Sequence, residues 1–198
     1  MMLINPYVFG HNFIFNLPFS SSVTYDEKGN TWSNIGTATI SDTAMYTGES
    51  GVVGVRNTSS SLMAFGLSDF EIGITVKLVS IPSGCVLIDS FRSAALGGNG
   101  FQLYVYQDGR LSFYQRSSPS NEVKTALSVV STGVYTAIKA KRISGVIYLY
   151  VDDVLVVSGS MNVSFNSEYT SIGYQHTDFG NGYYPSRGYF RNAYGVLI

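Results

Sequence analysis

The clearest alternation of apolar and polar residues in the chain falls within residues 69–79. The apolar positions are Phe70, Ile72, Ile74, Val76 and Leu78, and the positions between them are Glu71, Gly73, Thr75 and Lys77. Successive side chains of a β-strand point to opposite faces, so this period of two residues predicts a strand with one face in the core. The other face is expected to lie outside the core.

Residues 134–159 predict three more strands in immediate succession. Ile143-Ser144-Gly145 separates the first two strands, and the turn pair Asp152-Asp153 separates the second from the third. Such short connections are typical of antiparallel hairpins. In the middle strand Ile147, Leu149 and Val151 point to one side, while Tyr148 and Tyr150 point to the other.

Other β-rich segments are spread along the chain, and none has the pattern of a long amphipathic helix. We expect strands at residues 13–19, 31–40, 84–90, 125–130, 171–174 and 188–198, and a pair of short strands within residues 44–55. A hairpin is expected at residues 101–116, with Asp108-Gly109 at its tip. Residues 117–124 and 175–187 are expected to be loops. Many antiparallel strands with short turns predict an all-β fold, an antiparallel two-sheet β-sandwich of the jelly-roll type.

The first 22 residues are apolar and aromatic, and Pro6 and Pro18 interrupt them. A helix is disfavoured by these prolines and by the many β-forming residues. Residues 13–19 fit a first sandwich strand that pairs with the C-terminal strand, and residues 1–10 fit an extended arm that docks on a neighbouring subunit. We expect both, with an arm at residues 1–10 and a sandwich domain at residues 11–198. The expected anchors of the arm are Leu3, Tyr7 and Phe9.

Composition and charge narrow the class of protein. A chain of 198 residues can form one domain with a sizeable core, and its only cysteine, Cys85, is expected to be a buried, inert thiol. The net charge is −1, and the only cationic cluster, Lys139, Lys141 and Arg142, is assigned to a solvated strand end, so no nucleic-acid partner is expected. The chain contains no apolar run of the ~20 residues that a membrane helix needs, and no signal peptide is recognised.

Four segments resemble one known family in order and spacing. They are residues 65–72 (FGLSDFEI), residues 100–113 with the Asp108-Gly109 turn, residues 133–142, and residues 171–173 followed by 188–190. The chain is thus similar to the concanavalin A-like, laminin-G-like lectin-type β-sandwich domains that occur in bacteriophage structural proteins. The resemblance covers residues 32–198. Arg191-Asn192 stands where the family has Asp-Asp, and Lys139 replaces an apolar residue, which leaves the inward face of its strand open.

This resemblance implies a non-enzymatic structural or adhesion protein of a bacteriophage virion, a head decoration or tail-fibre tip subunit. Such a protein is made in the host cytoplasm, contacts other virion proteins and copies of itself, and can bind host cell-surface glycans. The alternative is a carbohydrate-binding lectin module without a structural role. A glycoside hydrolase ranks third, because the chain lacks the acidic residues that such enzymes space along one inner strand. No catalytic residue or cofactor is expected.

Tyrosine dominates the candidate contact residues, because its apolar ring and polar hydroxyl suit both sugar stacking and protein interfaces. Subunit interface, glycan contact and plain surface all remain open for the outward-facing tyrosines. The candidate glycan or partner contacts are Tyr174, His176, Phe179, Asn181, Tyr183, Tyr184 and Arg187. The candidate interface residues are Leu3, Tyr7, Phe9, Tyr104, Tyr106, Tyr114, Tyr148 and Tyr150.

No spacing of histidine, cysteine or carboxylate residues predicts a metal site. Calcium is considered because loop carboxylates and carbonyls hold it in many lectin-like sandwiches. The candidates are Asp108, Asp152 and Asp178, for which we favour a structural role in turns.

Overall fold

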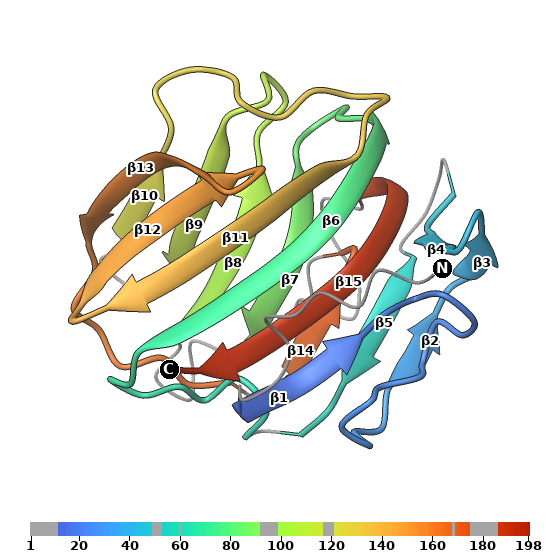
Figure 1. The fold of residues 1–198 in the computed structure, drawn as a ribbon, viewed down its shortest axis with the longest axis horizontal. Coiled ribbons are helices and arrows are strands. Elements are labelled where there is room, and N and C mark those ends of the chain that lie inside the picture. Colours follow the sequence, from blue (N-terminus) through green and yellow to red (C-terminus); the bar gives the residue numbers. More distant parts are fainter. Residues whose placement is uncertain are drawn as a thin grey trace.

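The computed structural model describes residues 12–48, 53–59, 61–91, 99–116, 121–167, 169–174 and 186–198. These residues form fifteen β-strands and no helix. The strands make two antiparallel sheets, one of eight strands and one of seven, which pack face to face (Figure 1). The prediction of an all-β, two-sheet sandwich is confirmed. Nothing in the described part of the chain forms a helix that could span a membrane.

The eight-stranded sheet, sheet A, is built around two long strands that pair with each other, β6 (Phe70–Ser80) and β15 (Arg187–Leu197). Beyond β6 it continues through β11 (Thr136–Ile143), β12 (Val146–Val151) and β13 (Val154–Ser160). Beyond β15 lie β1 (Asn12–Leu17), β4 (Ala44–Tyr46) and β3 (Thr39–Ser41). The antiparallel pairing of β1 with β15 confirms the predicted contact between the first strand and the C-terminal strand.

The seven-stranded sheet, sheet B, lies behind sheet A in Figure 1. Its order is β10 (Asn121–Lys124), β9 (Leu111–Arg116), β8 (Gly100–Val105), β7 (Cys85–Phe91), β14 (Tyr169–Ile172), β5 (Gly54–Asn57) and β2 (Ser33–Ile35). Strands β8 and β9 form the hairpin that the Asp108-Gly109 pair predicts.

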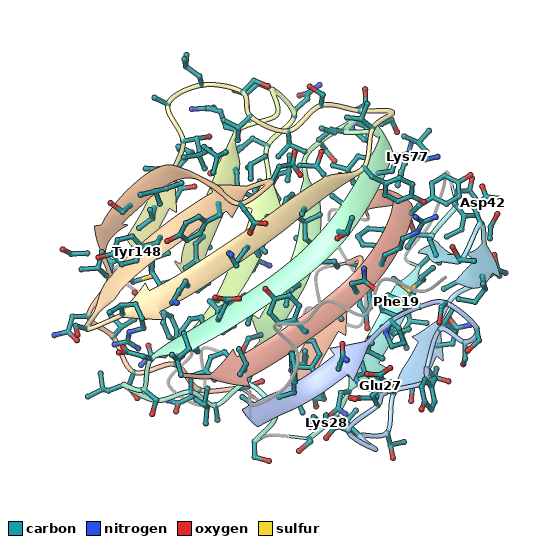
Figure 2. The ribbon with its side chains drawn as sticks, in the orientation of Figure 1. Phe19, Glu27, Lys28, Asp42, Lys77 and Tyr148 are labelled. Carbon is teal, nitrogen blue, oxygen red and sulfur yellow. The ribbon has the colours of Figure 1, made fainter. Side chains whose placement is uncertain are left out.

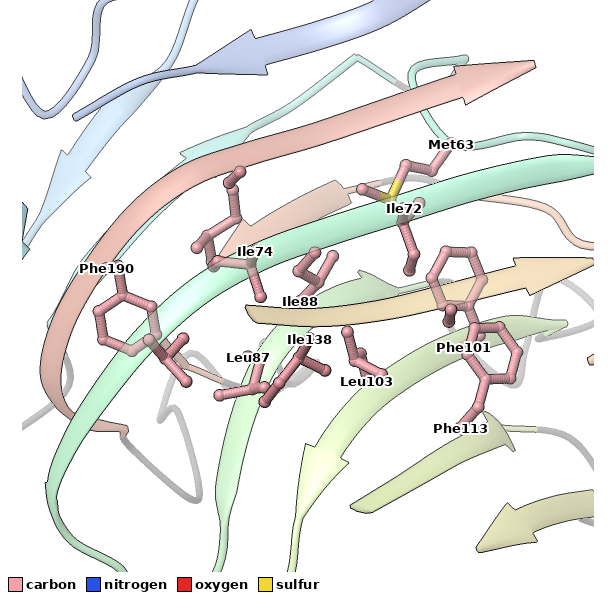
Figure 3. Close-up of a cluster of buried hydrophobic side chains, with 14 of the residues drawn as sticks. Met63, Ile72, Ile74, Leu87, Ile88, Phe101, Leu103, Phe113, Ile138 and Phe190 are labelled. Atoms are coloured by element: carbon pink, nitrogen blue, oxygen red, sulfur yellow. The ribbon is translucent and has the colours of Figure 1, made fainter. Parts of the chain in front are cut away.

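The core lies between the inner faces of the two sheets (Figure 3). The apolar face predicted for β6 is buried, and none of its five residues is more than 2% exposed. At one end of the core Phe70 packs against both Phe65 and Phe101, with ring centroids 4.3 and 5.8 Å away. Cys85 is buried as predicted, and its burial raises the pKa of the thiol.

Two-residue turns connect β11 to β12 and β12 to β13. Ser144 and Gly145 in the first turn, and Asp152 and Asp153 in the second, have φ angles between 49° and 77°. Two successive left-handed residues are the signature of the type I′ turn, whose twist matches that of the flanking strands. Both hairpins predicted in residues 134–159 are therefore confirmed.

The prediction of a loop at residues 117–124 followed by a strand at residues 125–130 is wrong, because the strand lies earlier in the sequence. Residues 121–124 form β10, which pairs with β9, and residues 125–130 have no strand structure. They instead wrap over the tip of the β8–β9 hairpin, where the backbone N–H groups of Val129 and Val130 both donate to the carbonyl of Gly109 at 3.0 Å. The apolar residues of this segment are therefore held by tip contacts rather than by a sheet ladder.

The assignment of all three cations of β11 to a solvated strand end is also wrong. Ile138 and Ala140 point into the core, so Arg142, at the next alternate position, points inward as well and is only 1% exposed. Its Nη1 donates to the carbonyl oxygens of Gly66 and Val163 at 3.0 and 2.9 Å. Lys139 and Lys141 lie on the opposite, outer face of sheet A, which settles the inward face of this strand.

Candidate functional site

A groove of about 190 Å³ crosses the outer face of sheet A, on the side facing the viewer in Figure 2. It runs over three neighbouring strands, β15, β6 and β11, and the turn between β12 and β13. Its lining residues are Ile74, Thr75, Ala137, Ile138, Lys139, Asp153, Asn192 and Tyr194.

A β-bulge in β15 shapes one wall of the groove. Arg191 pairs with Thr75 and Tyr194 pairs with Gly73, so β15 has one residue more than β6 over this stretch. Asn192 takes up the extra length with a φ of 50°, a left-handed conformation that asparagine tolerates better than most residues. The bulge leaves Asn192 exposed at the groove and places Tyr194 beside it.

The absence of a side chain at Gly73 leaves room for the Tyr194 ring. Gly73 lies beneath the ring, and a Cβ atom at this glycine would be only 2.4 Å from Tyr194 Cε1. The edge of the ring meets Phe13 of β1, with centroids 6.0 Å apart and planes 84° apart. The Tyr194 ring is thus fixed by its neighbours, which is the condition for a stacking surface that loses little entropy on binding.

The Tyr194 hydroxyl is a fixed donor. It donates to Glu71 Oε1 at 2.8 Å, and Glu71 Oε2 lies 3.8 Å from Lys141 Nζ. Burial of the hydroxyl and the negative charge of Glu71 raise the pKa of Tyr194 above its usual value. The hydroxyl therefore remains protonated at neutral pH, and the carboxylate stays in place on the outer face.

The opposite wall is formed by Lys139 and Asp153, whose Nζ and Oδ1 atoms are 3.0 Å apart. The turn is attached to the sheet by Ala137, whose N–H donates to Asp152 Oδ1 at 2.8 Å and whose carbonyl accepts from Asp152 N at 2.8 Å. The Asp153 side chain is 88% exposed, and pairs so exposed contribute only about 0–1 kcal/mol. Ammonium and carboxylate can therefore exchange this contact for one with a ligand at small cost.

The arrangement provides an aromatic ring, an ammonium, a carboxylate, an amide and a hydroxyl within one shallow hollow. Both donors and acceptors of hydrogen bonds are present. Sites for drug-sized ligands usually enclose about 300–1,000 Å³. The smaller volume of this groove suits a single ring-sized group of a ligand whose remainder lies on the surface.

The five outward tyrosines predicted from the strand patterns do not form one surface. Tyr148 and Tyr150 lie on the outer face of sheet A, where they pair with Lys141 and Lys139. Figure 2 shows Tyr148 on this face. Tyr104, Tyr106 and Tyr114 belong to the β8–β9 hairpin of sheet B, on the other side of the sandwich.

On sheet B, Tyr106 is already surrounded by protein groups. Arg110 and Lys124 lie over its ring, 5.2 and 4.8 Å from the centroid, and Tyr104 meets it at a centroid distance of 4.8 Å. Its hydroxyl donates to Glu122 Oε1 at 2.6 Å, and burial together with this contact raises its pKa. The adjacent hollow of about 510 Å³ is lined by Tyr106, Gln107, Asp108 and Arg110. Because Arg110 and Lys124 cover the ring of Tyr106, this hollow offers a sugar less aromatic surface for stacking than the groove on sheet A does.

Two of the predicted loop contacts flank the loop and can be placed. Tyr174 is only 3% exposed, and burial raises its pKa to about 12. Arg187 begins β15 and pairs with Ser80. The other predicted contacts lie outside the described residues, and so do the anchors of the arm; they are His176, Phe179, Asn181, Tyr183 and Tyr184, and Leu3, Tyr7 and Phe9.

The candidate calcium ligands that can be placed have protein partners. Asp108 Oδ2 accepts from Arg110 Nε at 2.7 Å, and Asp152 caps Ala137. Asp178 lies outside the described residues. Within the described ranges no three histidine, cysteine or acidic residues are grouped so that they could hold a metal ion.

Sequence reasoning missed the groove, although one signal of it is present. In β15 the inward residues Phe190 and Ala193 are three positions apart, whereas a regular strand would place them two apart. A break of this kind indicates a bulge. That Tyr194 then lies over Gly73 and opposite Lys139 depends on strand order, which the pattern does not contain.

Solved structures with a similar fold include proteins that bind carbohydrates. Domain 4 of AbnA, an extracellular GH43 arabinanase from Geobacillus stearothermophilus, is in complex with arabinotriose; it has a TM-score of 0.71 and 16% identity, over 94% of this chain and 93% of that one. The carbohydrate-binding module CBM66 from Bacillus subtilis has a TM-score of 0.58 and 14% identity, over 84% and 96% of the two chains. The Ruminococcus gnavus sialidase CBM40, bound to α2,3-sialyllactose, has a TM-score of 0.57 and 14% identity, over 67% and 76%.

The chain has the β-sandwich fold of these modules. At such low identity the likeness concerns the fold alone. No protein-family model and no curated protein matches the sequence. The lectin-like part of the resemblance found in the sequence agrees with these structures, whereas none of the three supports a bacteriophage origin.

Proposed function

We propose that this protein is a non-enzymatic carbohydrate-binding module that holds one sugar residue in the groove on sheet A. The observation that carries the proposal is the convergence of the Tyr194 ring with the polar groups of Lys139, Asp153 and Asn192 in a hollow of about 190 Å³. The fold shared with carbohydrate-binding modules supports it.

The chemistry of a sugar matches this combination of groups. A pyranose or furanose ring has C–H groups that pack on an aromatic face, and hydroxyls that both donate and accept hydrogen bonds. Tyr194 provides the aromatic surface, Lys139 and Asn192 provide donors, and Asp153 provides acceptors. One shallow subsite gives a modest affinity, because only one ring of the glycan is enclosed.

Binding without hydrolysis fits the acidic residues of this face. A glycosidase needs one carboxylic acid to protonate the leaving group and a second carboxylate facing it across the bond. Here Glu71 accepts a hydrogen bond from Tyr194, and Asp153 is paired with Lys139. Both carboxylates are engaged by donors of the protein, which suits the positioning of ligand hydroxyls.

The carbohydrate-binding module, the alternative at the sequence level, thus replaces the virion protein as the preferred function. The predicted head-decoration or fibre-tip role, the virion location and the homo-oligomer receive no support from the similar structures. A role in adhesion remains compatible with glycan binding, since an adhesin needs a site of this kind.

The proposal is tested with a glycan array, followed by calorimetric titration of the tightest binder. Tyr194→Ala and Lys139→Met should each lower the affinity at least about tenfold, the equivalent of 1.4 kcal/mol. Tyr106→Ala, on the outer face of sheet B, is the matched control and should bind as the unaltered protein does. The groove is excluded if only the control variant loses binding, and the function is excluded if no glycan binds.

A further inference from the structure

Two cations meet one tyrosine ring beyond the end of the groove. The guanidinium of Arg191 lies 4.1 Å from the Tyr135 ring centroid, and Lys77 Nζ lies 5.1 Å from the same centroid. Lys77 Nζ is also 4.4 Å from the centroid of Tyr189, whose ring packs on Tyr46 at 4.8 Å. We call Lys77, Tyr135, Tyr189 and Arg191 the cationic cluster.

The cations of this cluster have no acidic partner, unlike their neighbours on the same face. Lys139 is paired with Asp153 and Lys141 lies near Glu71, but within the described part of the chain no carboxylate lies within 4.0 Å of Lys77 or Arg191. Arg191 donates from Nη2 to a neutral acceptor, the carbonyl of Asp42. Figure 2 shows Lys77 near the end of β6 and Asp42 at the neighbouring edge of sheet A.

Two further donors in the cluster lack acceptors. Arg191 Nε and the Tyr135 hydroxyl are both buried and have no hydrogen-bond partner among the described residues. Buried donors without acceptors are unfavourable, and two like charges on one ring repel each other. An anionic group bound against Lys77 and Arg191 would offset the repulsion and supply an acceptor to the cluster.

The cationic cluster is continuous with the groove. Arg191 pairs with Thr75, and Thr75 pairs with Ala137, so Arg191 borders the lining of the groove directly. Lys77 lies two residues beyond Thr75 on β6, a distance of about 7 Å along the strand. A sugar in the groove can therefore extend a substituent, or the next sugar residue, into the cluster.

We propose that the glycan bound by this protein is acidic, and that Lys77, Tyr135 and Arg191 bind its carboxylate or sulfate group. This inference rests on the proposed function of the groove. The three side chains offer an ammonium, a guanidinium and a hydroxyl to one anion, and charge-assisted hydrogen bonds of this kind are stronger than neutral ones. Lys77 is half-buried against the rings of Tyr135 and Tyr189, so its charge is screened less than that of a fully exposed lysine.

A free phosphate polymer such as a nucleic acid is a poorer match for this anion site. The chain has a net charge of −1, and Lys139 and Lys141 on the same face are neutralised by acidic residues. Nucleic-acid surfaces need many unpaired cations that follow a backbone. A single pair of cations beside a sugar-sized groove fits one anionic substituent.

The test uses a panel of neutral oligosaccharides, each paired with its carboxylated and its sulfated counterpart. For the unaltered protein we expect an acidic member to bind at least about tenfold more tightly than its neutral counterpart, the equivalent of 1.4 kcal/mol. Lys77→Met, which keeps the apolar stem, should remove this advantage and leave the affinity for the neutral glycan unchanged. Arg191→Lys should reduce the advantage, and Lys141→Met is the matched control that should retain it.

The outcomes separate the two proposals. Neutral and acidic glycans that bind equally well, or an advantage that survives Lys77→Met, overturn this inference and leave the proposed function standing. Failure of every glycan to bind overturns the proposed function, and this inference with it. A preference for the carboxylated or the sulfated counterpart supports the inference and identifies the anion. That preference should also weaken as salt is raised from about 0.05 to about 0.5 M, because the Debye length then falls.

Discussion

The ring of Tyr194 lies so close to Gly73 that a Cβ atom on Gly73 would be 2.4 to 2.6 Å from two ring carbons, Cε1 and Cζ, and from the hydroxyl oxygen. The backbone of Gly73 is not in the left-handed region, so its conformation does not require glycine. The space that the Tyr194 ring occupies is what excludes a larger residue at this position. The relationship joins β6 to the bulged part of β15 and sets one wall of the groove.

Gly73→Ala should therefore destabilise the fold and weaken glycan binding together. Overpacking of this kind typically costs about 1–3 kcal/mol, because the ring must leave its position. The double variant Gly73→Ala/Tyr194→Ala should show most of this cost removed, since the clashing ring is absent. Urea unfolding of both single variants and of the double variant measures the coupling, which we expect at about 1 kcal/mol or more. Additive effects would show that the ring does not constrain Gly73.

A second prediction concerns Arg142, which holds an isolated β-bridge between Gly66 and Phe165 against the end of the core. Gly66 and Phe165 exchange backbone hydrogen bonds of 2.8 and 2.9 Å, and Arg142 Nη1 donates to the Gly66 carbonyl. Its guanidinium also lies 5.4 Å from the Phe165 ring centroid. Arg142→Met should lower the unfolding free energy by about 1–3 kcal/mol, since the part-buried carbonyls of Gly66 and Val163 lose a charged donor.

Lys141→Met is the matched control for Arg142. Lys141 is the preceding residue on the same strand, but it points to the outer face, and its partner Glu71 is 3.8 Å away. A pair so partly exposed contributes about 0–1 kcal/mol. Equal losses of stability in the two variants, measured by urea unfolding, would contradict the inward placement of Arg142.

The fold class could be predicted from the sequence because burial in a strand follows a period of two residues, and this period is visible in the sequence. β6 shows this most plainly, with five buried residues at alternate positions. The same pattern states that Tyr104 and Tyr148 face outward but does not state on which sheet, because sheet order depends on long-range pairing. The two tyrosines are consequently on opposite sides of the molecule.

The candidate groove depends on contacts that no local pattern contains. Glu71 and Tyr194, which hydrogen-bond across its edge, are 123 positions apart in the chain. Arg142 shows the same limit at the residue level: its charge suggested a solvated position, whereas in the structure it shares the inner face with Ile138 and Ala140. Backbone carbonyls at the end of the core accept hydrogen bonds from the guanidinium, and these distant partners are not visible in the sequence.

Asp26 provides a third prediction, because its buried carboxylate organises the connection between β1 and β2. Its Oδ1 accepts from the backbone N–H groups of Asn16 and Lys28 at 3.1 and 2.8 Å. Its Oδ2 accepts from Asn30 Nδ2 and Trp32 Nε1, both at 2.8 Å. The carboxylate is the acceptor in all four hydrogen bonds.

Asp26→Asn should lower the unfolding free energy by about 2–4 kcal/mol, since the NH₂ group of the amide would face two of these four donors. The fluorescence of Trp32, the only tryptophan, should change at the same time because its indole N–H loses an acceptor. Glu27→Gln, at the exposed neighbouring residue, is the control and should change stability by less than about 1 kcal/mol. An Asp26→Asn variant as stable as this control would refute the role of the carboxylate.

The last prediction concerns pH and Glu122, on the outer face of sheet B. Partial burial by itself would raise the pKa of Glu122, but hydrogen bonds from Tyr106, Ser112 and Lys124 more than offset it and hold the pKa below its usual value. A carboxylate whose pKa is lower in the folded state stabilises the fold above the unfolded-state pKa, about 4.3 for glutamate. This stabilisation is lost as the pH falls through the lower, folded-state value.

The unaltered protein should therefore exceed Glu122→Gln in unfolding free energy by a margin that is constant near pH 7 and shrinks below about pH 4. Tyr106→Phe removes the donor that lies 2.6 Å from Glu122 Oε1. At neutral pH the unfolding free energy of this variant should therefore exceed that of Glu122→Gln by a smaller margin than the unaltered protein does. Urea unfolding of the three proteins at several pH values between 7 and 3 measures this. If the margin stayed constant down to pH 3, the carboxylate of Glu122 would not be stabilised by these donors, and the contacts of Tyr106 on sheet B would have to be explained without it.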